Sequence, residues 1–145
     1  MKKLIKITVV LLMTLSLILS FASCNKQGVE NADALWESAT YTEDTTVGEG
    51  SKTLTLTVEA GDKSVVLTVK SDAATVGEAL IAHDIIKGDE SAYGLYVKEV
   101  NGIKADYDAD KAYWSFNKDG QYVMTGVDTT ELNDGDKYEF VYTKG

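Results

Sequence analysis

Two segments with strict alternation constrain the fold more than any other part of the chain. In "KTLTLTVE" (52–59) apolar residues at Leu54, Leu56 and Val58 alternate with threonines, and "KSVVLTVK" (63–70) repeats the pattern with valine and leucine. The letters "AGD" between them supply a turn. A period of two gives each strand one apolar face, so the sequence predicts a β-hairpin with one buried side.

The pattern then changes to that of a helix. Thr75 and Glu78 have the spacing of a capping box. The apolar residues from Val76 to Leu80 and the Ile85-Ile86 pair predict a short helix, or a helix plus an extension, packed on the hairpin. Gly77 lowers the helical propensity of this segment.

The C-terminal half returns to strands. "YGLYVKEVNGIKADY" (93–107) predicts a strand, an Asn-Gly hairpin turn and a second strand. "KAYWSFNKDGQYVMTGV" (111–127) predicts a hairpin around the turn at 117–120, and "NDGD" (133–136) precedes a last strand with Tyr138, Phe140 and Tyr142 on one face. Two strands, one short helix and several more strands predict an α+β domain with the β-grasp arrangement, in which one helix covers one face of a mixed sheet.

The N-terminus predicts export. Three lysines precede a run of apolar and small residues, and "FAS" stands directly before Cys24, the only cysteine. Residues 1–23 therefore predict a secretory signal. The small residues before Cys24 resemble the lipobox of bacterial lipoproteins, which implies that Cys24 receives a diacylglycerol and that the protein is extracytoplasmic and lipid-anchored at the cell membrane. A plain cleaved signal peptide and an uncleaved membrane anchor are the alternatives.

Removal of the signal leaves 122 residues, enough for one domain with a core. The signal holds three of the 14 basic residues and none of the 23 acidic ones, so the remainder carries a formal charge of −12. This charge disfavours nucleic acid and anionic membrane surfaces as partners. We expect a flexible tether at 24–33 and a domain at 34–145 with its core at about 52–142. Trp36 and Tyr41 belong to the ordered part, and 42–50 is expected to be a loop.

Several motifs in order and spacing point to one family. "TVGEAL", "GLYVKEVNGI", "AYWSF" and "TGVDTTELNDGDKYEFVY" look like the C-terminal domain of transcobalamin and intrinsic factor, which also occurs alone in bacterial surface lipoproteins of unassigned function. The resemblance covers about 52–142. It implies ligand binding without chemistry, because in the vitamin carriers this domain closes over cobalamin against a large helical domain.

The resemblance places the candidate ligand contacts at Gly94, Tyr96, Phe116 and Val123. These residues would offer apolar contact and one hydroxyl to a flat or bulky ligand. We assign Trp114 to the core and Phe116 to the opposite face of its strand, where it would be free to contact a ligand.

Other constellations are weaker. Asp106, Asp108 and Asp110 have the spacing of the first ligands of a calcium loop, but Lys111 takes the place of its glycine, so a solvated acidic turn is the favoured interpretation. His83 is the only histidine, and we interpret it as a cation near a helix C-terminus rather than a metal ligand. We predict no enzyme, no metal site and no cofactor.

Two functions of different class fit the sequence. The first is a lipid-anchored, non-catalytic binding protein that captures a corrinoid (cobalamin-like) or other small ligand and passes it to a transporter for uptake. The second is a lipid-anchored surface module that contacts another protein or a cell-wall polymer and takes no small molecule. The order of the family motifs favours the first function, and the lack of a helical partner domain in this sequence favours the second.

Overall fold

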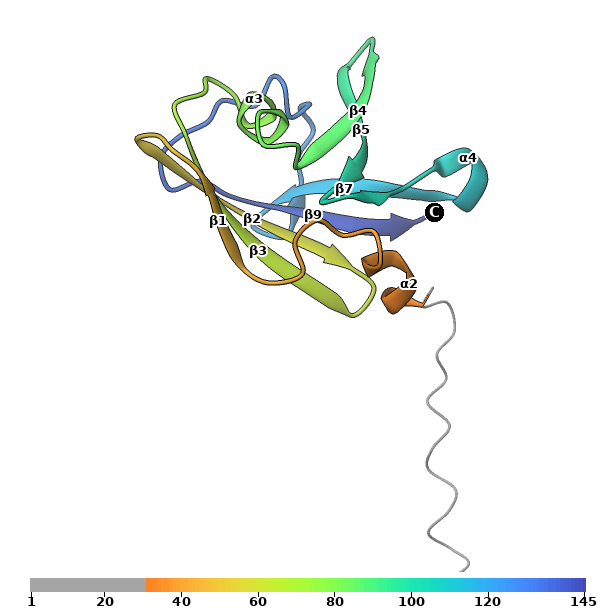
Figure 1. The fold of residues 1–145 in the computed structure, drawn as a ribbon. Coiled ribbons are helices and arrows are strands. Elements are labelled where there is room, and N and C mark those ends of the chain that lie inside the picture. The colour runs from red at the N-terminus through yellow and green to blue at the C-terminus, as the bar shows by residue number, and fades with distance from the viewer. Residues whose placement is uncertain (1–30) are drawn as a thin grey trace, which may run out of the picture.

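A large sheet covered on one face by a helix and a small sheet forms the body of the molecule (Figure 1). The computed structural model describes residues 31–145. The predicted signal at 1–23, Cys24 and most of the predicted tether lie outside the described residues. Within 31–145, no helix has both the length and the apolar character needed to cross a bilayer.

The described elements follow the chain in a simple order. They are α2 (Ala32–Trp36), β1 (Thr45–Gly48), β2 (Lys52–Ala60), β3 (Lys63–Ser71), α3 (Val76–Ile81), β4 (Ile86–Ser91), β5 (Gly94–Val100), β6 (Ile103–Lys104), α4 (Tyr107–Asp110), β7 (Ala112–Lys118), β8 (Gln121–Tyr122) and β9 (Lys137–Lys144). The large sheet has the strand order β1-β3-β2-β9-β7-β8, and the small sheet has the order β4-β5-β6. Strands β2 and β9 pair in parallel at the centre of the large sheet, which confirms the α+β class and its β-grasp arrangement.

The first hairpin forms as the alternation predicts. Leu54 pairs with Val69 and Leu56 with Leu67 across β2 and β3, and all four side chains are fully buried. The threonines between them lie on the other face and are half-buried. The pairing register therefore brings both apolar faces to the same side of the sheet.

The capped helix is also confirmed. The hydroxyl of Thr75 accepts a hydrogen bond from the backbone N–H of Glu78 at 3.2 Å, and the Glu78 carboxylate accepts one from the N–H of Ala74 at 3.1 Å. Gly77 has a packing reason to interrupt the helical pattern, because a Cβ atom there would lie 2.9 Å from the backbone of Asp128. Helix α3 therefore needs glycine at the point where the loop at 127–128 crosses it.

Two strands lie where the sequence analysis expects none. Strand β1 falls inside the expected loop at 42–50, and β4 begins at Ile86, in the expected helical extension. Neither gives a clear signal in the sequence: β1 has only four residues, which alternate between half-buried and exposed without a buried apolar side chain, and only Ile86 of β4 is buried. Backbone hydrogen bonds to a neighbouring strand, and not a side-chain pattern, define both strands: β1 pairs in parallel with β3, and β4 pairs with β5.

The N-terminal segment packs on the domain as Trp36 and Tyr41 indicate. The indole N–H of Trp36 donates to the carbonyl of Ala60 at 2.9 Å. Asn101, which is fully buried, accepts a hydrogen bond from the N–H of Tyr41 at 2.9 Å and donates one to its carbonyl at 2.8 Å. The predicted Asn101-Gly102 turn therefore also holds the segment before β1.

The strands give the large sheet two distinct ends. Helix α2 lies at the Ala60 end of β2. Because β9 runs parallel to β2 and β7 runs antiparallel to β9, the start of β7 lies at the same end as α2. The end of β7, strand β8 and the loop that follows lie at the opposite end (Figure 1).

Candidate functional site

A cavity of about 130 Å³ lies between the small sheet and the large sheet. Its lining comes from β5, β7, β8, β9 and the loop after β8: Leu95, Tyr96, Val97, Tyr113, Trp114, Phe116, Tyr122, Val123, Thr125, Gly126, Val127 and Phe140. Every one of these residues is uncharged. The polar groups of the lining residues are therefore limited to backbone, the tyrosine hydroxyls, the hydroxyl of Thr125 and the indole N–H of Trp114, which donates to the carbonyl of Ile103.

The interpretation that put Phe116 and Trp114 on opposite faces of their strand is wrong. Residues two positions apart in a strand share a face, and both side chains are 6% exposed in the core. The ring of Phe116 stacks on Tyr138 with 4.9 Å between the ring centroids. The indole of Trp114 donates to the carbonyl of Ile103 at 3.1 Å. Phe116 therefore forms the inner wall of the cavity and is not an exposed platform.

Tyr96 lines the cavity, but its ring belongs to the outer face of β5. Val97 is buried, whereas Tyr96 is 42% exposed. The ammonium of Lys98, on the same outer face, lies 6.0 Å from the centroid of the Tyr96 ring. Alternation along β5 thus turns Leu95 and Val97 toward the core and leaves the ring of Tyr96 facing outward.

The other two sequence candidates have different positions. Val123 is half-buried in the cavity lining, and its N–H donates to the carbonyl of Phe116 at 2.8 Å. Gly94 is not part of the lining. It has a φ of 100°, which side chains rarely allow, and a Cβ atom there would lie 2.6 Å from the carboxylate of Asp128. Both the backbone conformation and the contact with Asp128 therefore require glycine. The structure therefore brings together Tyr96, Phe116 and Val123, with Gly94 supporting the nearby loop.

Exposed apolar side chains next to the cavity lining form what we call the rim: Tyr122 belongs to the lining, Met124 follows the lining residue Val123, and Tyr93 lies two residues before Leu95. Tyr93 is 93% exposed in the turn between β4 and β5, Met124 is 89% exposed after β8, and Tyr122 is also exposed. A Cβ atom at Gly126 would lie 3.3 Å from the carbonyl oxygen of Tyr93, so the two loops are in contact. The carboxylate of Asp128 joins them by accepting a hydrogen bond from the N–H of Leu95 at 3.1 Å.

Sequence reasoning missed these rim residues. The sequence pattern predicts that Tyr122, Val123 and Met124 form the return of the hairpin, whereas β8 has only two residues and the chain then leaves the sheet. The run Tyr122-Val123-Met124 is apolar without alternation, and such a run after a tight turn was the signal that could have indicated an exposed loop.

The residues considered for metal binding and catalysis have structural roles here. The carboxylate of Asp106 accepts hydrogen bonds from the N–H groups of Asp108 and Ala109 and so caps α4. The imidazole of His83 lies against Gly48, where a Cβ atom would be 2.5 Å from its Nε2. Among residues 31–145, no group of three or more His, Cys, Asp or Glu side chains is placed to hold a metal ion. What the cavity offers is uncharged surface of defined shape.

Comparison with known proteins identifies the family. The sequence profile of the family described as "Domain of unknown function (DUF4430)" matches residues 73–144. A similar protein from Ruminococcus gnavus ATCC 29149, named provisionally as metal binding, has a crystal structure. Its sequence is 33% identical to this one, and the two structures superpose with a TM-score of 0.62. The match covers 66% of this chain and 99% of that one. The chain belongs to the DUF4430 family.

The DUF4430 domain also shares its fold with part of haptocorrin. The structure of haptocorrin in complex with Cbi matches with a TM-score of 0.53 and 17% identity, over 68% of this chain and 26% of haptocorrin. The match thus spans about a quarter of the haptocorrin chain, and at this identity it shows the fold alone. It confirms the predicted resemblance to a transcobalamin-like domain. No curated protein matches the sequence.

Proposed function

We propose that this DUF4430 protein is a lipid-anchored, extracytoplasmic, non-catalytic binding protein. Its site is the cavity between β5 and β7, and its ligand is a corrinoid or another bulky small molecule that it passes on for uptake. The observation that carries the proposal is the uncharged cavity together with the exposed rim residues Tyr93, Tyr122 and Met124 beside its lining. Exposed apolar side chains gathered at a concave site are typical of ligand-binding surfaces.

The size of the cavity limits how the ligand is held. A volume of about 130 Å³ is below the roughly 300–1,000 Å³ of pockets that enclose a drug-sized molecule. The cavity therefore takes one apolar group of the ligand, and the rest lies across the rim. The Cbi complex of haptocorrin, a protein that shares this fold, supports a corrinoid as the first ligand to test.

The arrangement of the strands supports presentation away from a membrane. The described chain begins at Asn31, next to α2, at the Ala60 end of the large sheet. The rim residues follow the end of β7, at the opposite end (Figure 1). A domain held through Cys24, upstream of α2, would therefore turn the cavity mouth away from its point of attachment.

Titration of the full chain in non-ionic maltoside micelles tests the proposal. We expect cobinamide to change its absorbance on binding, with heat released or absorbed in calorimetry. The double change Tyr122→Ser, Met124→Ser should weaken this binding at least tenfold, because it removes the apolar rim. The matched control is Tyr107→Ser, which removes an exposed tyrosine from α4 at the other end of β7 and should leave the affinity unchanged.

The same titration separates the two candidate functions. Equal affinity in the rim variant and the Tyr107→Ser control would refute the assignment of the cavity. Absence of binding by cobinamide and by haem would refute the small-molecule proposal and favour the alternative, a surface module whose exposed rim contacts a protein or a cell-wall polymer.

A further inference from the structure

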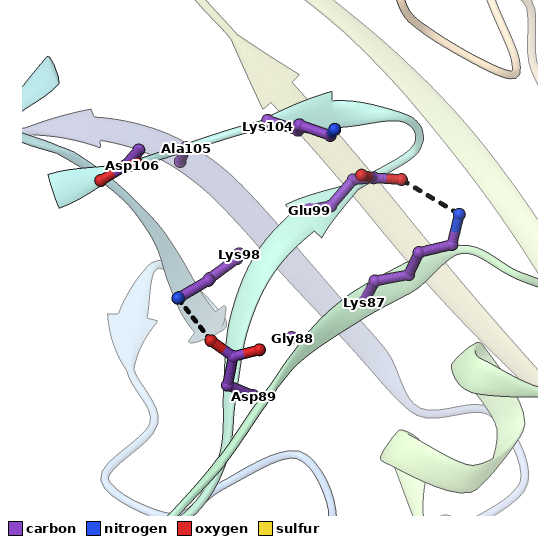
Figure 2. Close-up of a pocket in the computed structure, with 8 residues that line it drawn as sticks. All are labelled: Lys87, Gly88, Asp89, Lys98, Glu99, Lys104, Ala105 and Asp106. Carbon is purple, nitrogen blue, oxygen red and sulfur yellow. Dashed lines mark hydrogen bonds and ion pairs between the residues drawn. The ribbon is translucent and has the colours of Figure 1, made fainter. Parts of the chain in front are cut away.

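A second hollow, of about 280 Å³, lies on the outer face of the small sheet (Figure 2). Six of its eight lining residues are charged, three of each sign, and the other two are small: Lys87, Gly88, Asp89, Lys98, Glu99, Lys104, Ala105 and Asp106. Its composition is therefore the reverse of that of the apolar cavity. No part of the proposed function uses it.

A β-bulge brings the central charges together. Lys87 pairs with Glu99 and Gly88 pairs with Val97, so Lys98 is an extra residue in β5. An extra residue in a strand redirects side chains that would otherwise alternate between faces, and both Lys98 and Glu99 line the hollow. Gly88 permits the bulge, because a Cβ atom there would lie 2.0 Å from the carbonyl oxygen of Tyr96.

The charged side chains of the hollow form two rows that run across the three strands. The first row has two cations and one anion. Backbone pairing places Glu99 between Lys87 of β4 and Lys104 of β6. The ammonium of Lys87 lies 3.3 Å from the carboxylate of Glu99. Lys104 makes no ion pair with another described residue. This row therefore has a net charge of +1, with Lys104 as its available cation.

The second row has two anions and one cation. Lys98 donates a hydrogen bond to the carboxylate of Asp89 (Figure 2). That bond, with the attraction of Asp89 and then of Asp106, holds the pKa of Lys98 above its ordinary value. One oxygen of Asp106 caps α4, and its other oxygen remains available. This row therefore has a net charge of −1.

We propose that the hollow binds a short zwitterion of about dipeptide length, with the ligand carboxylate at Lys104 and the ligand ammonium at Asp106. These two residues are two positions apart, with Asp106 in extended backbone, which places their Cα atoms about 6.6 Å apart. Two extended residues of a peptide span about 7 Å. The two Cα atoms therefore lie about one dipeptide length apart, and the long side chain of Lys104 would bring its ammonium to the ligand carboxylate.

The paired rows select against simpler ligands. A lone anion that approaches Lys104 meets Glu99 beside it and a chain with a formal net charge of −9. A lone cation that approaches Asp106 meets Lys98. An apolar ligand would desolvate charged walls without compensation. Only a ligand with both charges gains at both rows, because like-charge contacts penalise the others.

The two sites lie on opposite faces of β5, so this inference is independent of the proposed function. The ring of Tyr96 and Lys98 lie on the outer face, and Leu95 and Val97 face the core. Loss of corrinoid binding would leave the charged hollow unaffected, and the reverse holds too.

The probe is glycylglycine, titrated to about 10 mM at low salt, since solvent-exposed charges bind weakly and are screened. We label the full chain with 15N in a non-ionic maltoside micelle and follow amide shifts by NMR. Glycylglycine should shift the amides of 87–89, 98–99 and 104–106 in a saturable way. N-acetylglycine carries only the carboxylate and glycinamide only the ammonium, so each should shift them far less at the same concentration.

Variants identify the contacts. Lys104→Gln should raise the Kd of glycylglycine about fivefold, and Lys104→Arg should restore it. Asp106→Asn should also weaken binding while it keeps the cap of α4, because asparagine caps helices as well as aspartate does. The matched control is Glu90→Gln, which removes an exposed carboxylate of β4 outside the lining and should change nothing.

Three outcomes would overturn the proposal. One is the absence of saturable shifts with glycylglycine. Another is equal shifts with the single-charge probes, which would indicate diffuse electrostatic attraction. The third is an equal loss of affinity in Lys104→Gln and the Glu90→Gln control.

Discussion

Replacement of Phe116 by alanine gives the sharpest test of the corrected strand faces. The side chain is 6% exposed, stacks on Tyr138 at 4.9 Å between centroids, and contacts Phe140 at 5.0 Å. Removal of a buried aromatic ring of this kind costs about 3–5 kcal/mol of unfolding free energy. Trp114→Ala should cost a similar amount, because Trp114 is equally buried and also loses its hydrogen bond to Ile103.

The assay is equilibrium unfolding in urea, followed by circular dichroism. With a slope of about 2 kcal/mol per molar urea, a loss of about 4 kcal/mol moves the midpoint down by about 2 M. Ser115→Ala is the control, since Ser115 is half-buried on the other face of β7 and donates only to the side chain of Asn117; its cost should be about 1 kcal/mol. If Phe116→Ala were no more harmful than Ser115→Ala, the assignment of both aromatics to the core face would be refuted.

Three further predictions concern the anchor, the buried asparagine and the helix crossing. Cys24→Ala should leave the protein unprocessed or soluble, because no second cysteine can accept the lipid; normal processing with unchanged partitioning into a detergent phase would contradict the lipoprotein proposal. Asn101→Ala should lower the free energy of unfolding in urea by about 2–4 kcal/mol, since it removes both hydrogen bonds to Tyr41 and strains a residue with a φ of 53°. A loss smaller than that of Ser115→Ala would show that the N-terminal segment contributes little to stability. Gly77→Ala should destabilise by about 1–3 kcal/mol despite the higher helix propensity of alanine, because the new Cβ meets the backbone of Asp128 at 2.9 Å; a raised melting temperature would contradict this contact.

The sequence predicts those parts of the fold that depend on residues close together in the chain. The hairpin of β2 and β3, the Thr75 cap and the Asn101-Gly102 turn each follow from residues close together in the chain. The edge strand β1 and the hairpin strand β4 do not, because neither has an apolar alternation in its sequence. Pairing with β3, about 20 residues away, forms β1, and pairing with the neighbouring strand β5 forms β4.

The candidate site is recovered only in part, for a similar reason. Tyr96, Phe116 and Val123 do meet at one cavity, as the family resemblance implies. The rim depends on contact between two loops far apart in sequence, through Asp128 and Gly126, and no local pattern indicates that contact. The role given to Phe116 failed for a different reason, since the period of two was misapplied to residues 114 and 116.

Strand β5 explains how one small sheet carries two surfaces of opposite character. Before the bulge, alternation turns Leu95 and Val97 to the apolar cavity and leaves Tyr96 outside. At the bulge, one extra residue places Lys98 beside Glu99 in the charged hollow. Deletion of Lys98 would remove the bulge and place Glu99 directly after Val97, so Glu99 would keep its outward orientation and its pairing with Lys87. We expect the deletion to leave the small sheet folded, as Lys98→Gln, which keeps the bulge, also should. A melting temperature of the deletion variant far below that of Lys98→Gln would show that the extra residue is not accommodated as a bulge in an otherwise regular pair of strands.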